Sequence, residues 1–426
     1  MRRRIELDHI ARIEGHGSLR IDWKDDRVKD VKFEITEGAR LLEGLVVGRP
    51  YQDVAPICSR ICGICSSVHC LAAIECTEHA FGVRPSPQAE LFRDLLLRGE
   101  NVESHALHLF LLVLPDYLGY ADAMKMAADH RNVAQAGLRL KKLGNLIQET
   151  VGGRAIHPVT PVIGGFSCYP STDQLVLLRD RLEEGLRDCY NILPVVVSLP
   201  RYVSCRADVA FAATRSPTVY GYAGSDDIVI TSDGCSEAVS ALGYHAITNE
   251  YAVPYSHAKH SKRDGAPFMV GALARLQTNG HRITGFASEV IDQLHLVPSE
   301  HVPLDNNLAQ FVELAYDVEH SLQVVEQLLR EGVEPDSLPA VEPRACTGTA
   351  VLAAPRGLLF YSLSYDDAGR VVAADVVTPT AMNAAGVEHI VRWAGEQFAD
   401  NDAAELTKRF EMIVRAFDPC ISCAVH

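Results

Sequence analysis

The chain has 426 residues, of which 47% are hydrophobic, so it is long enough to bury a large core and is typical of a globular protein. Its formal net charge of -15 is spread along the sequence without a basic block, which excludes a typical nucleic-acid-binding protein. The N-terminus lacks the apolar segment of a signal peptide, and the longest apolar run, 109–114, is far shorter than the roughly 20 residues of a membrane span. Twelve cysteines in a chain of this length are too sparse for a disulfide scaffold, so we expect a protein of the reducing cytoplasm.

Residue patterning predicts helices and strands in an order that mixes both types along the chain. The predicted elements are strands over 5–36, long helices over 87–114 and 121–149, helices over 172–193 and 305–332, strands over 357–377 and helices over 382–417. Residues 200–300 are richer in Gly, Pro and Ser and predict an irregular, peripheral β/α excursion. Because no long polar linker interrupts the sequence, we predict one α+β domain over 1–426, mainly α, with a long central helix bundle and small peripheral sheets.

Two C-x-x-C pairs lie near opposite ends of the chain, Cys62 with Cys65 and Cys420 with Cys423. If the fold brings them together, they supply four thiolates, which are soft ligands typical of zinc, iron–sulfur clusters, copper(I) or nickel. The pattern alone leaves a closed structural zinc site and a redox-active metal site both open. The paired cysteines therefore predict a metal site that joins the two ends of the molecule.

Other features near the cysteine pairs favour a site with more than a structural role. His69 and His426 each lie close to a pair, and a closed zinc site has no need of further ligands or donors. The same stretches of sequence also concentrate charged residues, namely Glu14, Glu43, Arg60, Arg356 and Asp418. Zinc ribbons moreover keep their two knuckles close in sequence, unlike these pairs.

Six motifs in order along the chain resemble those of the large subunit of nickel–iron hydrogenases. They are Arg12-Ile13-Glu14-Gly15-His16, Glu37-Gly38-Ala39-Arg40-Leu41-Leu42-Glu43, Arg60-Ile61-Cys62-Gly63-Ile64-Cys65 with His69, Ala354-Pro355-Arg356-Gly357, Thr378-Pro379-Thr380-Ala381-Met382-Asn383, and Asp418-Pro419-Cys420-Ile421-Ser422-Cys423-Ala424-Val425-His426. The resemblance implies that family's fold. It also implies its activity, the reversible heterolytic cleavage of dihydrogen.

The resemblance implies a metal centre held by the four cysteines. Cys62, Cys65, Cys420 and Cys423 would bind nickel, and Cys65 and Cys423 would also bridge to an iron that carries carbon monoxide and cyanide. Cys420 would be the first proton acceptor. Strong-field ligands and electron-rich thiolates suit this redox chemistry.

Around this centre, the resemblance implies roles for four further residues. Glu14 would relay the proton away from Cys420, whereas the plainer alternative is that it pairs with Arg12 or caps a turn. Arg356 would lie over the metals and contact cyanide, with Asp418 pairing with Arg356 or merely starting a turn. Thr380 would donate to the second cyanide or be an ordinary residue at a strand end.

The resemblance further implies a buried magnesium site, or a site for another divalent ion. Glu43, His426 and the backbone carbonyl of Val376 would be its protein ligands. His69 would donate to a bridging thiolate, although a histidine on a helix surface is the alternative. Relatives are commonly made with a short extension after this last histidine, which a dedicated protease removes once nickel-insertion factors have acted, so we expect a mature form.

Two residues differ from the family pattern, and eight cysteines lie outside its motifs' metal-binding pairs. Tyr361 stands where many relatives have histidine, and Ser104 stands where several respiratory members have aspartate, so the proton and water networks are expected to differ. Both changes point away from the membrane-bound uptake branch. The eight other cysteines are expected in the core, where free cysteine is common, and Cys58 is the one nearest a ligand.

The chain is most similar to cytoplasmic, bidirectional, NAD(P)-linked and sulfhydrogenase-like enzymes of the family. Because it has neither a Rossmann glycine motif nor a remaining set of cysteines with the spacing of a ferredoxin cluster, its electrons must leave through an obligate iron–sulfur small subunit, followed by flavin subunits. Three alternatives stay open: a deazaflavin or heterodisulfide reductase partner, a dihydrogen-sensing protein, and a zinc protein or metal-free relative of respiratory-complex quinone subunits.

Overall fold

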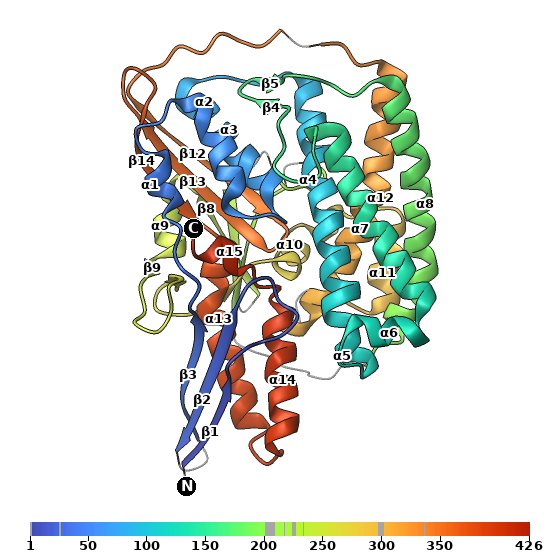
Figure 1. The fold of residues 1–426 in the computed structure, drawn as a ribbon, viewed down its shortest axis with the longest axis vertical. Coiled ribbons are helices and arrows are strands. Elements are labelled where there is room, and N and C mark those ends of the chain that lie inside the picture. The colour runs from blue at the N-terminus through green and yellow to red at the C-terminus, as the bar shows by residue number, and fades with distance from the viewer. Residues whose placement is uncertain are drawn as a thin grey trace.

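The computed structural model describes residues 2–24, 27–200, 209–216, 218–223, 227–232, 234–296, 302–335 and 337–426. Cys205, expected in the core, lies outside these residues. Helices dominate the described chain and pack beside several small sheets (Figure 1), which confirms the predicted class. Among the described helices, none is long and apolar enough to cross a membrane.

Four long helices form a bundle along one side of the molecule (Figure 1): α4 (Pro87–Leu107), α7 (Arg131–Gly152), α8 (Thr172–Val197) and α12 (Asn306–Glu331). Their starts follow from local chemistry, since the Ser86 and Ser171 side chains cap α4 and α8. Helices α4 and α7 approach closely at Gly144, where an added Cβ would lie 2.3 Å from the Glu103 nitrogen. The bundle is thus fixed by caps and by backbone contact.

Two predicted helices are less regular than the sequence pattern indicates. The segment predicted over 87–114 widens into a π-helical turn, η2 (His108–Val113), before the short α5 (Leu114–Leu118). The segment predicted over 121–149 is divided at His130 into α6 (Ala123–Asp129) and α7, because His130 adopts a non-helical backbone. The other two long helices match their predicted ranges to within a few residues.

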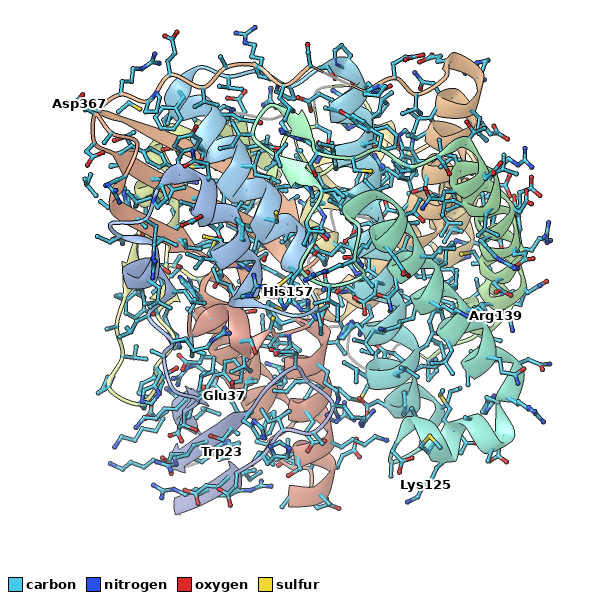
Figure 2. All side chains as sticks on the ribbon, turned by 45° about the horizontal axis from the view of Figure 1, so that its top comes forward. Trp23, Glu37, Lys125, Arg139, His157 and Asp367 are labelled. Carbon is cyan, nitrogen blue, oxygen red and sulfur yellow. The ribbon has the colours of Figure 1, made fainter. Side chains whose placement is uncertain are left out.

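The N-terminal strands form an antiparallel sheet in the order β1 (Arg2–Leu7), β2 (Gly17–Lys24) and β3 (Arg27–Ile35). This sheet packs against α13 (Pro379–Gln397) and α14 (Ala403–Ala416). Figure 2 shows Trp23 on this sheet, and its indole N–H donates to the carbonyl of Gly395 in α13 at 3.2 Å. The two ends of the chain are therefore joined by direct packing.

A second antiparallel sheet contains β12 (Cys346–Ala354), β13 (Gly357–Tyr365) and β14 (Val371–Val377). The prediction began at residue 357 and so missed β12. Helix α3 (Ser66–Phe81) packs on this sheet, preceded by α1 (Leu42–Val46), α2 (Tyr51–Cys58) and the 3₁₀ turn η1 (Ser59–Ile61). Gly348 is required here, since an added Cβ would lie 1.9 Å from the Cys76 carbonyl of α3.

The described part of the 200–300 region consists of short strands and helices, and three of its strands have only two residues. Its elements are β6 (Ala210–Thr214), β7 (Asp227–Ser232), β8 (Cys235–Ser240), η3 (Ala241–Gly243), α9 (Tyr244–Thr248), β9 (Glu250–Tyr251), β10 (His260–Ser261), β11 (Phe268–Met269), α10 (Ala272–Asn279), η4 (Gly280–Arg282) and α11 (Phe286–Leu294). Residues of β7 and β11 share a second hydrophobic cluster with Phe360 and Met382. This region therefore supports the sheet that carries Tyr361 and Val376.

The remaining described elements are the hairpin of β4 (Pro161–Val162) and β5 (Gly165–Phe166), the 3₁₀ turn η5 (Pro303–Asp305) and the short C-terminal helix α15 (Ile421–Ala424). Helix α15 contacts α13, and Figure 1 shows it in the middle of the molecule between the β12–β14 sheet and α13. An isolated parallel bridge joins Cys420 to Glu14. The C-terminal segment is therefore an internal part of the fold.

A buried ion pair joins α10 to the bundle. Both oxygens of Glu313 accept from the Arg275 guanidinium at 2.7 Å, and both side chains are at most 2% exposed. Burial raises the pKa of Glu313, but Arg275 and His105 outweigh it and bring the pKa down to about 2. This pair stabilises the fold fully above the ordinary glutamate pKa, and that stabilisation is lost as the pH falls towards 2.

We expect Arg275→Met to lower the free energy of unfolding by about 3–5 kcal/mol, because it leaves the Glu313 carboxylate buried without its bidentate arginine partner. Denaturant unfolding of the purified protein would measure this change. Arg181→Met is the matched control, since Arg181 pairs with Glu184 at the surface and should change stability by at most about 1 kcal/mol. Equal effects of the two substitutions would contradict the prediction.

Candidate metal centre

The structure brings the two cysteine pairs together in the interior. Cys62 follows the turn η1 and Cys65 precedes α3, while Cys420 and Cys423 lie at the start and within α15. The four Sγ atoms lie within 4.8 Å of one another. Cys62 is 3.4 Å from Cys420, and Cys423 is 3.0 Å from both Cys65 and Cys420. All four side chains are buried, so the cluster is preformed.

The pKa values of these thiols indicate that the cluster requires a cation. The pKa of Cys62 is lowered because Cys420, Cys423 and Cys65 hydrogen-bond to its sulfur. Burial raises the pKa of Cys65 and brings that of Cys423 to about 11. Four adjacent thiolates therefore need a cation to compensate their charge, and a metal ion supplies it.

Arg356 stands beside the sulfurs and is fixed by Asp418. Its Nε donates to the Asp418 carbonyl at 2.9 Å, and its Nη2 lies 3.1 Å from the Asp418 carboxylate. Burial opposes the charge of Arg356, yet Asp418 and Cys420 hold its pKa well above the ordinary value. Its Nη1 is buried and has no hydrogen-bond partner in the described structure. An acceptor next to the metal would satisfy this N–H group.

Asp418 is itself held by the helix bundle, which confirms its predicted pairing with Arg356. Gln310 donates to its carboxylate at 3.0 Å, and His108 lies 3.7 Å from it. Burial raises the pKa of Asp418, but Arg356, His108 and His105 outweigh it and lower the pKa. The π-helical turn that begins at His108 positions this contact.

Thr380 lies at the start of a helix, so the alternative of a strand end is wrong. It occupies the first turn of α13 directly after Pro379, a residue favoured there because its φ is already helical. The Cys420 backbone N–H donates to its Oγ1 at 2.9 Å. The Thr380 hydroxyl proton is thus directed away from that amide and can serve a further acceptor.

Glu14 contacts the C-terminal cysteine segment and does not pair with Arg12, although its bond to the first turn of α15 leaves a capping role open. Its carboxylate accepts from the Ser422 backbone N–H at 2.9 Å and from the Ser422 hydroxyl. Arg12 instead donates to Asp116 and to the Leu112 carbonyl. The half-buried Glu14 carboxylate is therefore held against the loop that carries Cys420 and Cys423.

His69 lies inside the protein and not on a helix surface. Its Nε2 is 3.6 Å from the Cys423 sulfur, and its Nδ1 is 2.7 Å from the Tyr361 hydroxyl. Complete burial lowers the pKa of His69 to about 3, so the ring is neutral. The predicted contact of His69 with a cysteine of the cluster is thus present in the geometry.

The three groups of the predicted divalent-ion site also converge. His426 Nε2 lies 2.9 Å from the Val376 carbonyl and 3.7 Å from Glu43, whose Oε1 accepts from the Val376 N–H at 2.9 Å. Burial raises the pKa of Glu43, but His426 and the Val376 amide outweigh it and lower the pKa. A carboxylate, a carbonyl and an imidazole are therefore within reach of one ion.

The sequence reasoning did not assign a role to Arg40, which joins the two cysteine segments. Its guanidinium donates to the carbonyls of Ile61 and Ser422, both at 2.5 Å, and to that of Arg60 at 3.2 Å. Its backbone N–H donates to the Val425 carbonyl. In the sequence, the only indication of this role was that Arg40 is the basic residue of the motif at 37–43.

The expectation that all other cysteines are core residues is only partly right. Cys58, Cys70, Cys76 and Cys189 are buried, but Cys168 and Cys235 are exposed and Cys346 is intermediate. Cys168 lies in a loop and Cys235 lies on the edge strand β8, and at both positions the side chain is left uncovered. Ser104 is buried, and its hydroxyl has no partner among the described residues.

Comparison with known proteins agrees with this geometry. A family model described as nickel-dependent hydrogenase matches residues 40–143 and 231–426, and one described as HoxL-like matches 4–37. The chain is 37% identical to the alpha subunit of sulfhydrogenase 1 from Pyrococcus furiosus over 99% of this chain and 97% of that protein. It is 27% identical to the beta subunit of the NAD-reducing hydrogenase HoxS from Cupriavidus necator, covering 100% and 95% of the two chains.

The fold agrees as well. A crystal structure of an NAD⁺-reducing [NiFe]-hydrogenase in the H2-reduced state superposes with a TM-score of 0.89 at 26% identity, covering 100% of this chain and 99% of that one. The chain belongs to the nickel-dependent hydrogenase family. Within that family it is an oxidoreductase, the catalytic large subunit of a nickel–iron hydrogenase.

Proposed function

We propose that this protein cleaves and forms dihydrogen reversibly at a nickel–iron centre held by its four cysteines. The observation that carries the proposal is the convergence of four buried sulfurs with the unsatisfied Nη1 of Arg356 and the carboxylate of Glu14. A closed zinc site would not require either group. The donor set also fits a soft, redox-active metal.

In this proposal all four cysteines would hold nickel, and Cys65 and Cys423 would also hold an iron that carries carbon monoxide and cyanide. When bound, the centre would supply the heterolytic cleavage of dihydrogen. Arg356 would offer its free Nη1–H, and Thr380 its hydroxyl, as donors to the cyanides.

The protein's own residues carry the proton away from the metals. The Cys420 sulfur receives the proton, and the Glu14 carboxylate, held on the adjacent Ser422, passes it outward. Asp418 acts through Arg356, whose guanidinium it fixes in place. This division assigns proton transfer to Cys420 and Glu14, and positioning to Asp418.

The site of Glu43, Val376 and His426 is proposed to hold magnesium or another divalent ion. His426 Nδ1 contacts the Cys423 carbonyl at 2.7 Å, so an ion there would stiffen the segment that carries two nickel ligands.

Electrons are proposed to leave through an iron–sulfur small subunit, and from there through flavin subunits to NAD(P) in the cytoplasm. The similarity to the NAD-reducing hydrogenase HoxS and to the NAD⁺-reducing structure supports this acceptor. A second candidate is an acceptor other than a nicotinamide, because one component of the F420-non-reducing hydrogenase vhc of Methanococcus voltae is 29% identical to this chain. Assaying the intact complex with NADH and NADPH distinguishes the two candidate acceptors, because only a complex coupled to NAD(P) oxidises or reduces a nicotinamide.

We expect the purified complex to contain about one nickel per catalytic chain and to show infrared bands of carbonyl and cyanide ligands. Elemental analysis and infrared spectroscopy measure these two quantities on the same sample. Zinc at the four cysteines without such bands would refute the proposed function.

A further inference from the structure

A buried chain of contacts leads away from the sulfur of Cys423. Cys423 meets His69 Nε2, and His69 Nδ1 meets the hydroxyl of Tyr361 at 2.7 Å. Beyond it, the Cys58 thiol interacts with the same hydroxyl. All four residues are buried, so water does not compete for these bonds. The proposed mechanism of dihydrogen cleavage uses neither Tyr361 nor Cys58.

The sulfur of Cys423 determines which group donates and which accepts in every hydrogen bond of this series. A sulfur that binds metal carries no proton, so Cys423 can only accept, and His69 must present Nε2–H to it. Because a neutral imidazole has one N–H, its Nδ1 is then an acceptor. Tyr361 must therefore donate its O–H to Nδ1, and the Cys58 thiol can donate to the Tyr361 oxygen.

The protonation states agree with this direction. Burial raises the pKa of Tyr361 well above its ordinary value and raises that of Cys58 to about 12. Both donors therefore keep their protons over the working pH range.

We infer that Tyr361 is a positioning residue that fixes the tautomer and orientation of His69 and thereby controls the hydrogen bond received by the bridging sulfur of Cys423. The inference rests on the proposed function, since it requires a metal at this sulfur. Each donor in the chain polarises the next, so the Tyr361 hydroxyl strengthens the His69 N–H as a donor. Hydrogen bonds to a ligating sulfur reduce the electron density that it gives the metal.

The test is infrared spectroscopy of the intact complex carrying Tyr361→Phe, which removes only the hydroxyl. We expect nickel content to be retained and the carbonyl and cyanide bands to move to lower wavenumber, because the sulfur becomes a stronger electron donor. The same change should make the redox midpoint of the centre more negative. Bands and midpoint identical to those of the unmodified complex would overturn the inference.

Tyr365→Phe is the matched control. Tyr365 lies on the same strand β13, is 2% exposed, and its hydroxyl bonds Thr77 of helix α3 at 2.7 Å, just as Tyr361 bonds His69 of that helix. Loss of this hydroxyl removes an equivalent buried bond without touching the chain to Cys423. We expect its bands to be unchanged, and an equal shift in both variants would show a general packing effect and overturn the inference.

A double variant tests whether Tyr361 acts through His69. In His69→Gln an amide N–H can face Cys423 without any choice of tautomer, so adding Tyr361→Phe should give no further band shift. A further band shift as large as the one that Tyr361→Phe causes when His69 is unchanged would overturn the inference.

If Tyr361→Phe fails to load nickel, Cys58→Ala replaces it. We expect Cys58→Ala to cause a smaller band shift in the same direction, and unchanged bands would overturn the proposal. Absence of these bands from the unmodified complex would refute the proposed function instead.

Discussion

Cys420→Ser is expected to lower dihydrogen-dependent activity by at least about a thousandfold, because it removes a metal ligand and the proposed proton acceptor together. The Cys420 sulfur lies 3.4 Å from Cys62 and 3.0 Å from Cys423, so serine would fit the space. A serine hydroxyl does not ionise in the working pH range and is a poor ligand for nickel. Dihydrogen oxidation with a dye acceptor and exchange of deuterium gas with water measure the loss.

The control for this prediction is Cys346→Ser, which changes a partly exposed cysteine on β12 outside the cluster. Its activity should match that of the unmodified complex. Retention of more than about a tenth of the activity in Cys420→Ser would contradict the role assigned to this sulfur, since losses at a directly reacting group are far larger.

Glu14→Gln is expected to lower deuterium exchange by about 100- to 10,000-fold while metal content stays unchanged. The amide of glutamine keeps the size of the carboxylate and can still accept from the Ser422 N–H, so the loop should keep its position. It cannot take up and release a proton at ordinary pH. Exchange kinetics, together with infrared bands that match those of the unmodified complex, separate this effect from a loss of metal.

Glu37→Gln tests whether any nearby carboxylate would show the same result. Glu37 is a partly exposed carboxylate whose described side-chain hydrogen bonds go to the His16 backbone and ring and not to the cysteine segments. We expect its exchange rate to be unchanged. If Glu14→Gln also exchanged at the normal rate, another group would have to carry the proton.

The sequence predicted most elements because their patterns are local. The four bundle helices have apolar residues at helical spacing and recognisable caps such as Ser86 and Ser171. The break at His130 and the π-helical turn at His108 were missed because neither residue type marks a break. Strand β12 was missed as well, although Gly348 and the residues after it are buried against α3.

The site was predicted in its ligands but not in its connections. Paired cysteines identify themselves by spacing, and the motifs placed Glu14 and Arg356 beside them. No local pattern reports that Arg40 reaches the Ser422 carbonyl 382 residues away, or that Tyr361 meets His69 across 292 residues. Such contacts depend on how α3 packs on β13, which only the tertiary structure shows.

The joining of the two cysteine segments also has a consequence for the order of folding. The Glu14 to Ser422 hydrogen bond spans 408 residues, and the contact of Cys62 with Cys420 spans 358. Contacts with such long loops are entropically costly until the intervening chain is folded, so we expect them to form late. Until Cys420 and Cys423 dock, only two of the four clustered sulfurs, those of Cys62 and Cys65, are in place. The time at which the C-terminal segment docks would then decide when metal can enter.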